Sequence, residues 1–124
     1  MEDVKSYFLD TYALIEIVKE NQNYERFKEL VNFSSYMNLL ELHYIISRNF
    51  DSKKADFLID KLKSVLLKVE VKDILEASKF KLKHAKKKFS YIDCLGYAMA
   101  LNRNIKFLTG DNEFKDLNNV EFVK

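Results

Sequence analysis

A single carboxylate stands in the most apolar helical stretch of this chain. The run SYIDCLGYAMAL (residues 90–101) carries one formal charge, at Asp93, although 32% of the 124 residues are charged. Such a run is too apolar for a surface helix, so we predict a helix buried on most sides, capped by Ser90 and ending near Asn102. Burying a carboxylate costs several kcal/mol unless a cation or hydrogen-bond donors replace its water. No Lys or Arg lies within a turn of Asp93, so either a residue distant in sequence or a metal ion must compensate its charge.

Three other acids stand alone in apolar surroundings. Asp10 is the only formal charge in SYFLDTYALI (residues 6–15), and Glu41 is the only one between Glu29 and Arg48. Asp111 follows the apolar run IKFLTG (residues 105–110), which ends in a turn. The four acids therefore form a set whose spatial relationship decides what the chain can do.

The order of predicted elements indicates the fold class. We predict strands over Val4–Leu9, Phe33–Met37, Leu67–Val71, Ile105–Thr109 and Val120–Val123. We predict helices from Asp10 or Thr11 to Lys19, over Tyr24–Val31, over Asn38–Phe50 with Asn38 or a neighbour as cap, from Asp51-Ser52 to about Leu66, over Asp73–Lys88, and within Gly110–Asp116. Strands that alternate with helices favour an α/β fold with a mostly parallel sheet covered on both faces.

Three details of these elements are also predicted. In the 73–88 helix, the residues expected to face inward are Ile74, Ala77, Ser78, Leu82 and Ala85. Gly96 is expected to admit a neighbouring backbone closely, and Gly110 to supply the permissive φ that follows a strand.

The predicted sheet would bring the four acids to one edge. Ligands of open α/β sheets collect at the carboxyl ends of the strands. Asp10 and Asp111 follow predicted strands, while Glu41 and Asp93 lie about one turn into predicted helices. Clustered carboxylates repel one another, and a divalent ion removes that repulsion. Hard oxygen ligands select Mg²⁺ or Mn²⁺, ions that support phosphodiester hydrolysis by activating water.

Four short motifs in this order resemble the PIN domain, and most closely the VapC-type ribonuclease toxins of toxin–antitoxin pairs. They are FLDT (residues 8–11), LEL (40–42), YID followed by LGYA (91–98) and LTGDNEF (108–114). The resemblance implies a flavodoxin-like three-layer α/β/α sandwich that binds Mg²⁺ or Mn²⁺ and cuts RNA. It implies catalytic and metal-binding roles for Asp10, Glu41, Asp93 and Asp111, with Thr11 and Thr109 as supporting hydroxyls. It also implies a homodimer inhibited by a small antitoxin protein.

Each acid also has a purely structural interpretation. Ser90 and Asp93 match a capping box, in which the carboxylate reaches back to the Ser90 amide. Asp10 is a plausible plain N-cap, Glu41 a solvent-facing helix residue, and Asp111 a turn residue. A capping carboxylate keeps lone pairs for a metal, so the structural and catalytic interpretations are compatible.

The densest positive stretch is KFKLKHAKKK (residues 79–88), which ends five residues before Asp93. One interpretation is that Lys83, Lys86 and Lys87 bind RNA phosphates. The alternative is an ordinary solvated helix face.

Composition bounds the remaining possibilities. A chain of 124 residues with 48% hydrophobic residues is long enough for one domain, over residues 1–124, with a true core. One cysteine, no apolar leader and no long apolar run predict a cytoplasmic protein with no membrane partner. Two alternatives to a toxin remain: a non-catalytic PIN-like module that binds RNA or protein, and an RNA-processing PIN nuclease outside toxin–antitoxin systems.

Overall fold

A parallel β-sheet forms the centre of the protein in the computed structural model, which describes residues 5–62 and 65–124. Every strand pair within those residues is parallel, and the spatial order is β3-β2-β1-β4-β5. The strands are β1 (Ser6–Leu9), β2 (Val31–Ser35), β3 (Leu66–Leu67), β4 (Lys106–Thr109) and β5 (Val120–Phe122). The predicted parallel α/β fold is therefore confirmed.

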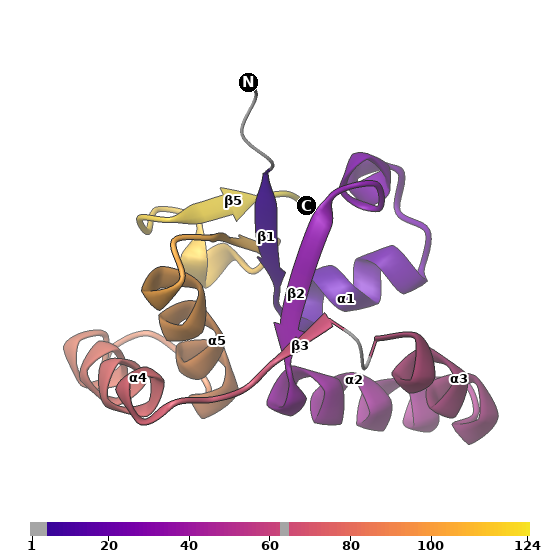
Figure 1. Ribbon diagram of the computed structural model, residues 1–124, viewed down its shortest axis with the longest axis horizontal. Coiled ribbons are helices and arrows are strands. Elements are labelled where there is room, and N and C mark those ends of the chain that lie inside the picture. Colours follow the sequence, from indigo (N-terminus) through magenta and orange to yellow (C-terminus); the bar gives the residue numbers. More distant parts are fainter. Residues whose placement is uncertain (1–4, 63–64) are drawn as a thin grey trace.

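Helices cover both faces of this sheet, which gives three layers (Figure 1). They are α1 (Thr11–Val18), the 3₁₀ helix η1 (Gln22–Phe27), α2 (Tyr36–Asn49), α3 (Ser52–Leu62), α4 (Val71–Lys83), α5 (Tyr91–Asn102) and the 3₁₀ helix η3 (Asn112–Phe114). Neighbouring residues of β1 point to opposite faces, as a strand requires. Tyr7 and Leu9 join the core beneath α1, α2 and α3, whereas Phe8 joins the core beneath α4 and α5.

The core beneath α4 and α5 is built from aromatic rings that pack against one glycine. Phe107 lies between Phe8 and Phe114, with ring centroids 5.9 and 4.8 Å away. A Cβ added at Gly96 would lie 2.9 Å from Cε1 of Phe8, so any side chain there would displace this ring or lift α5 from the sheet. The prediction that Gly96 admits a close neighbour is correct in kind, but the neighbours are the rings of Phe8 and Phe107 rather than a backbone.

Several predicted boundaries shift, and one predicted helix is wrong. Residues 24–31 do not form one α-helix: the 3₁₀ helix η1 ends at Phe27 and β2 begins at Val31. The predicted 33–37 strand ends at Ser35, because the Ser35 hydroxyl accepts a hydrogen bond from the Asn38 amide and caps α2. Ser35, not Asn38, is therefore the cap. The first strand begins at Ser6 within the described residues; Val4 and residues 63–64 lie outside them.

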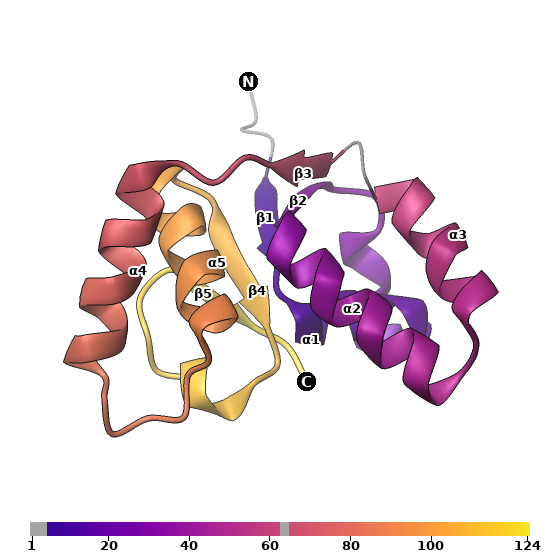
Figure 2. The ribbon, with the colours of Figure 1, turned by 90° about the horizontal axis from the view of Figure 1, so that it is seen from below.

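Helix α4 differs most from its prediction. It ends at Lys83 rather than Lys88, and Ala77 is its only buried member of the five residues expected to face inward. Ile74 and Leu82 are 53% and 79% exposed. The three- and four-residue spacing of the five predicted residues marks a shared helix face. However, α4 lies beside α5 (Figure 2) and packs on it through Ala77 and Phe80. The apolar face therefore lies at the surface.

Candidate active site

Asp10 is a buried carboxylate at the end of β1. Its side chain caps α1 by accepting a hydrogen bond from the Ala13 amide at 2.8 Å. The other carboxylate oxygen accepts a hydrogen bond from the Thr109 hydroxyl at 2.5 Å. Burial raises the pKa of Asp10 to about 7, against these two hydrogen bonds and with help from the charges of Asp93 and Asp111. Asp10 is therefore the N-cap of α1, as one interpretation of the sequence predicts. Its two hydrogen bonds do not fully offset the cost of burying its negative charge.

Asp93 is held at the start of α5 by a reciprocal capping box. Its carboxylate accepts from the Ser90 amide at 2.9 Å, and the Ser90 hydroxyl accepts from the Asp93 amide at 3.0 Å. Burial raises the pKa of Asp93, the Ser90 hydrogen bonds lower it, and the charges of Asp111 and Glu41 raise it again. The carboxylate is thus both a structural cap and a neighbour of other acids.

Glu41 is oriented by a chain of side-chain hydrogen bonds that the four sequence motifs do not reveal. The Ser35 hydroxyl donates to Asn38 Oδ1 at 2.5 Å, and Asn38 Nδ2 donates to the Thr11 hydroxyl at 3.1 Å. The Thr11 hydroxyl in turn donates to Glu41 Oε1 at 2.5 Å. The only sign of these hydrogen bonds in the sequence is the spacing Ser35-x-x-Asn38-x-x-Glu41, which places the three residues at the start of α2.

Asp111 lies in a tight turn after β4. Its carboxylate accepts from the Glu113 amide at 3.0 Å, and its own amide donates to the Thr109 hydroxyl at 3.1 Å. The prediction that Gly110 supplies a left-handed φ is wrong, since no glycine within the described residues has a positive φ. Space explains the glycine instead: a Cβ there would lie 2.2 Å from Cε1 of Tyr12.

Together these four acids form a negative rim where β1 and β4 end and where α2 and α5 begin. Asp10 and Asp93 are each affected by the charges of two others. Within residues 5–62 and 65–124, no Lys, Arg or His forms an ion pair with any of them. Carboxylate oxygens are the donors that hard dications such as Mg²⁺ bind.

The carboxylates are not gathered into a closed coordination shell. No three His, Cys, Asp or Glu side chains in the described part of the chain are arranged to hold a metal ion. Mg²⁺ keeps several waters and is commonly bound through one or two carboxylates, so a pair of these acids with water would fit that ion.

Comparison with known proteins identifies the family. The family model "PIN domain" matches residues 7–120. The chain belongs to the PIN domain family. The PIN domain match covers all four acids and both threonines of the rim. No curated protein sequence matches this chain closely enough to add a relative.

Solved structures share this PIN fold. VapC20 of Mycobacterium tuberculosis, described as a sarcin–ricin loop cleaving toxin, has a TM-score of 0.80 at 17% identity, over 95% of this chain and 99% of that chain. VapBC2 of Rickettsia felis, bound to a promoter DNA fragment, has a TM-score of 0.72 at 21% identity, over 96% and 99%. DNA-bound VapBC of Salmonella typhimurium has a TM-score of 0.74 at 18% identity, over 95% and 96%. At these identities the likeness shows the fold.

The three lysines singled out in the sequence have different surroundings in this PIN domain. Lys83 borders a hollow with Tyr97 and Leu117, whereas Lys87 lines a groove between α4 and α5. Lys86 is exposed in the turn between those helices. Lys87 Nζ also donates to the Glu113 carbonyl at 2.7 Å, which ties this turn to the segment after Asp111.

None of the helices in residues 5–62 and 65–124 combines the length and apolar character that crossing a lipid bilayer needs.

Proposed function

We propose that this PIN domain is a metal-dependent endoribonuclease that hydrolyses RNA phosphodiester bonds. One observation carries the proposal: four acids from distant parts of the sequence share a rim with no ion-paired cation among the described residues, and two of them have raised pKa values. Carboxylates grouped in this way are destabilised until a cation joins them.

The proposed roles follow from the contacts of each residue. Asp10 and Asp93 would hold Mg²⁺ or Mn²⁺, and Glu41 and Asp111 would supply further carboxylate ligands. A bound ion of this kind lowers the pKa of water and stabilises negative charge on a phosphate. Thr109 keeps the Asp10 carboxylate oriented, and Thr11 does the same for Glu41. Neither His43 nor His84 has a role in this scheme: His43 contacts Asp56 at 2.9 Å and the ring of His84 packs on Phe80.

The lysine-rich segment supplies phosphate contacts in this proposal. Lys86 and Lys87 precede α5, and Lys83 ends α4. Contacts of this kind make binding depend on salt. Replacing all three lysines with glutamine should therefore weaken RNA binding and flatten its salt dependence. Unchanged salt dependence would assign the segment to an ordinary solvated surface.

The direct experiment is RNA cleavage with Mn²⁺, with Mg²⁺ and with EDTA. Cleavage should require the ion and should be lost in Asp10→Asn and Asp93→Asn. Asp116→Asn is the matched control, because Asp116 is exposed and lies outside the rim. Cleavage that persists in EDTA or in both rim variants would reject the mechanism.

We further propose that the protein is the toxin of a toxin–antitoxin pair, acts as a homodimer, and is inhibited by a small antitoxin. The support is the likeness in fold to the VapC and VapBC proteins. A neighbouring gene for a small protein with a DNA-binding fold would supply the candidate antitoxin. Co-expression of that protein should relieve growth arrest and abolish cleavage in vitro.

A second candidate is a PIN module that binds RNA or protein without cutting. Its support is that no three His, Cys, Asp or Glu side chains in the described residues are arranged to hold a metal ion. Thermal stabilisation by Mn²⁺ without any turnover would support this alternative. A PIN nuclease of RNA processing would instead cut RNA with no antitoxin gene nearby.

A further inference from the structure

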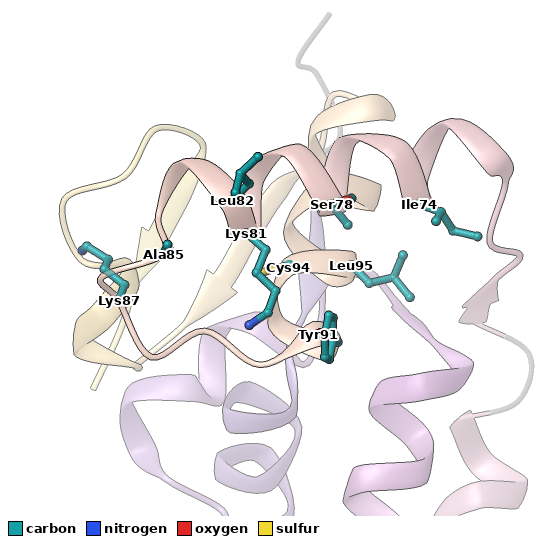
Figure 3. Close-up of a pocket in the computed structure, with 10 residues that line it drawn as sticks. Ile74, Ser78, Lys81, Leu82, Ala85, Lys87, Tyr91, Cys94 and Leu95 are labelled. Carbon is teal, nitrogen blue, oxygen red and sulfur yellow. The ribbon is translucent and has the colours of Figure 1, made fainter.

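A groove lies between α4 and α5 (Figure 3), and its lining residues Tyr91 and Cys94 flank Asp93 in the first turn of α5. Its cavity measures about 610 Å³, within the roughly 300–1,000 Å³ range of small-ligand pockets. Ala77 and Cys94 form its floor, and Ile74, Leu82 and Leu95 form apolar walls. These walls include the apolar residues of α4 that were predicted to face inward, so the groove explains why a helix carries them at the surface.

One exposed aromatic ring stands at the end of the groove nearest the rim. Tyr91 is the first residue of α5, two residues before Asp93, and is 79% exposed. The ammonium of Lys81 lies 4.7 Å from the centre of its ring and donates to the Phe89 carbonyl at 2.6 Å. Figure 3 shows the Lys81 side chain reaching from α4 toward this ring. The cation covers part of the ring, and the exposed remainder is an open stacking surface.

The charges of the groove contrast with those of the rim. Lys81 and Lys87 line it, and none of its described lining residues is Asp or Glu. Across the first turn of α5, the surface thus changes from clustered carboxylates to cations around an aromatic ring. Proteins that bind single-stranded nucleic acids combine such cations, which follow the backbone, with aromatic rings on which bases stack.

We propose that this groove binds an unstacked nucleobase of single-stranded RNA, stacked on Tyr91, one or two nucleotides from the phosphate at the rim. The proposal rests on the endoribonuclease function above and names its substrate class as an unpaired segment. Lys81 and Lys87 attract the flanking phosphates. A second copy of the chain is a poorer occupant, because a two-fold contact through this surface sets a lysine-bordered patch against its own equivalent.

Binding without cleavage tests the groove separately from catalysis. A short unstructured RNA carrying one 2-aminopurine is titrated in EDTA, since stacking quenches that base. The wild-type protein should quench it, and Tyr91→Ala should weaken affinity about tenfold and lose the quenching. Tyr91→Phe should bind nearly as the wild type does. An RNA with an abasic site at the reporter position should bind the wild type and Tyr91→Ala equally.

The chain offers a matched control. Phe57 of α3 is 58% exposed, and Lys61 Nζ lies 4.7 Å from the centre of its ring, yet neither lines the groove. Phe57→Ala should therefore leave RNA affinity and quenching unchanged. An equal loss in Phe57→Ala and Tyr91→Ala would overturn the proposal, because any exposed ring would then suffice.

The outcomes separate this proposal from the nuclease function. Quenching that requires Tyr91, in a protein that cuts no RNA, supports the groove and rejects the enzyme. Cleavage whose KM is the same in Tyr91→Ala and wild type supports the enzyme and rejects the groove. Sedimentation showing a wild-type dimer that Tyr91→Ala dissociates would overturn the proposal in favour of a protein interface, as would absence of RNA binding by the wild type.

Discussion

The hydroxyl of Thr11 donates a hydrogen bond of 2.5 Å to Glu41, linking the first turn of α1 to the first turns of α2. The same hydroxyl accepts from Asn38, which is buried and bonded to Ser35. The Thr11 hydroxyl has one proton, and Asn38 donates to Thr11 rather than accepting from it, so that proton is directed at the Glu41 carboxylate. The orientation of Glu41 is therefore fixed by a residue that lies next to Asp10 in the sequence.

Replacing this hydroxyl should damage the site more than the fold. Thr11→Val keeps the shape of the side chain but leaves Glu41 without its donor. We expect a loss of roughly 10- to 100-fold in RNA cleavage or in Mn²⁺ affinity, the usual effect of removing a partner that orients a metal ligand. Thr11→Ser retains the hydroxyl and should restore most of the loss. RNA cleavage rates and isothermal titration of Mn²⁺ measure the two effects. Equal activity and equal Mn²⁺ affinity in the valine and serine variants would show that the hydrogen bond has no functional role.

The raised pKa of Asp10 predicts a stability that depends on pH and metal. Asp10 titrates near pH 7 when folded, but near 3.9 when unfolded. The folded state therefore holds this proton more tightly, and the contribution of Asp10 to stability is greatest below about pH 4 and is lost as the pH rises through 7. In EDTA, wild type should lose a few kcal/mol relative to Asp10→Asn over this range. Denaturant titrations of both proteins at matched pH values measure the difference.

A divalent ion should reverse that loss. At a concentration one hundred times its dissociation constant, Mn²⁺ should stabilise the folded state by about 2.7 kcal/mol, because it binds the native rim and not the unfolded chain. Asp10→Asn should show a smaller gain. Melting temperatures that do not respond to Mn²⁺ at neutral pH would contradict a metal site at this rim.

The positions of the acids were predictable because each is marked by contrast with its surroundings. Asp93 in an apolar helix and Asp10 after a buried strand stand out without any structural knowledge, and parallel topology brings such positions to one edge. The part that Asn38 and Ser35 play in orienting Glu41 was not predicted, because polar residues near a helix start are common as caps. Only the fold, which carries Thr11 from another element to Asn38, shows that they act together.

The errors in the fold have similar causes. The spacing of Ile74 and Leu82 reports which residues share a helix face, but not whether another element covers that face. Residues 22–31 contain apolar residues at helical intervals, yet the side chain of Asn32 donates to the Phe27 carbonyl and the chain turns directly into β2. That contact between neighbouring segments depends on the sheet and leaves no periodic signal in the sequence.

A buried ion pair at the C-terminal end of α5 predicts the acid sensitivity of the fold. Arg103 contacts both carboxylate oxygens of Asp73 at 2.9 Å, and Asn102 donates a third hydrogen bond at 2.9 Å. Burial alone would raise the pKa of Asp73, but these bonds and one from the Glu70 amide bring it down to about 2. Because the folded pKa lies below the unfolded one, the stabilisation is complete above about pH 4 and is lost as the pH falls through 2.

Removing one partner of this ion pair should destabilise the fold more than removing both partners. Arg103→Leu leaves a buried carboxylate without its cation and should cost about 3–5 kcal/mol at pH 7. The double variant Asp73→Leu, Arg103→Leu should recover much of that loss, since the uncompensated charge is gone. Urea denaturation of the two variants gives the comparison. A double variant as unstable as the single one would mean that the pair contributes through geometry specific to its hydrogen bonds rather than through charge compensation.

Gly110 should tolerate no side chain, and the effect should reach the acidic rim. A Cβ at this position would lie 2.2 Å from the Tyr12 ring and 2.4 Å from the Val123 carbonyl oxygen, which also accepts a hydrogen bond from Tyr24. The ring of Tyr12 can move, but the carbonyl belongs to the backbone after β5. Gly110→Ala should therefore cost about 1–3 kcal/mol and displace Asp111 and Thr109, the neighbours on either side. Gly96→Ala meets side-chain atoms alone, the Phe8 ring at 2.9 Å and the Phe107 ring at 3.3 Å, and serves as the comparison. It should lower stability without a selective loss of Mn²⁺ affinity, whereas Gly110→Ala should lose both. Equal Mn²⁺ affinity in the two variants would show that the turn holding Asp111 is independent of the rim.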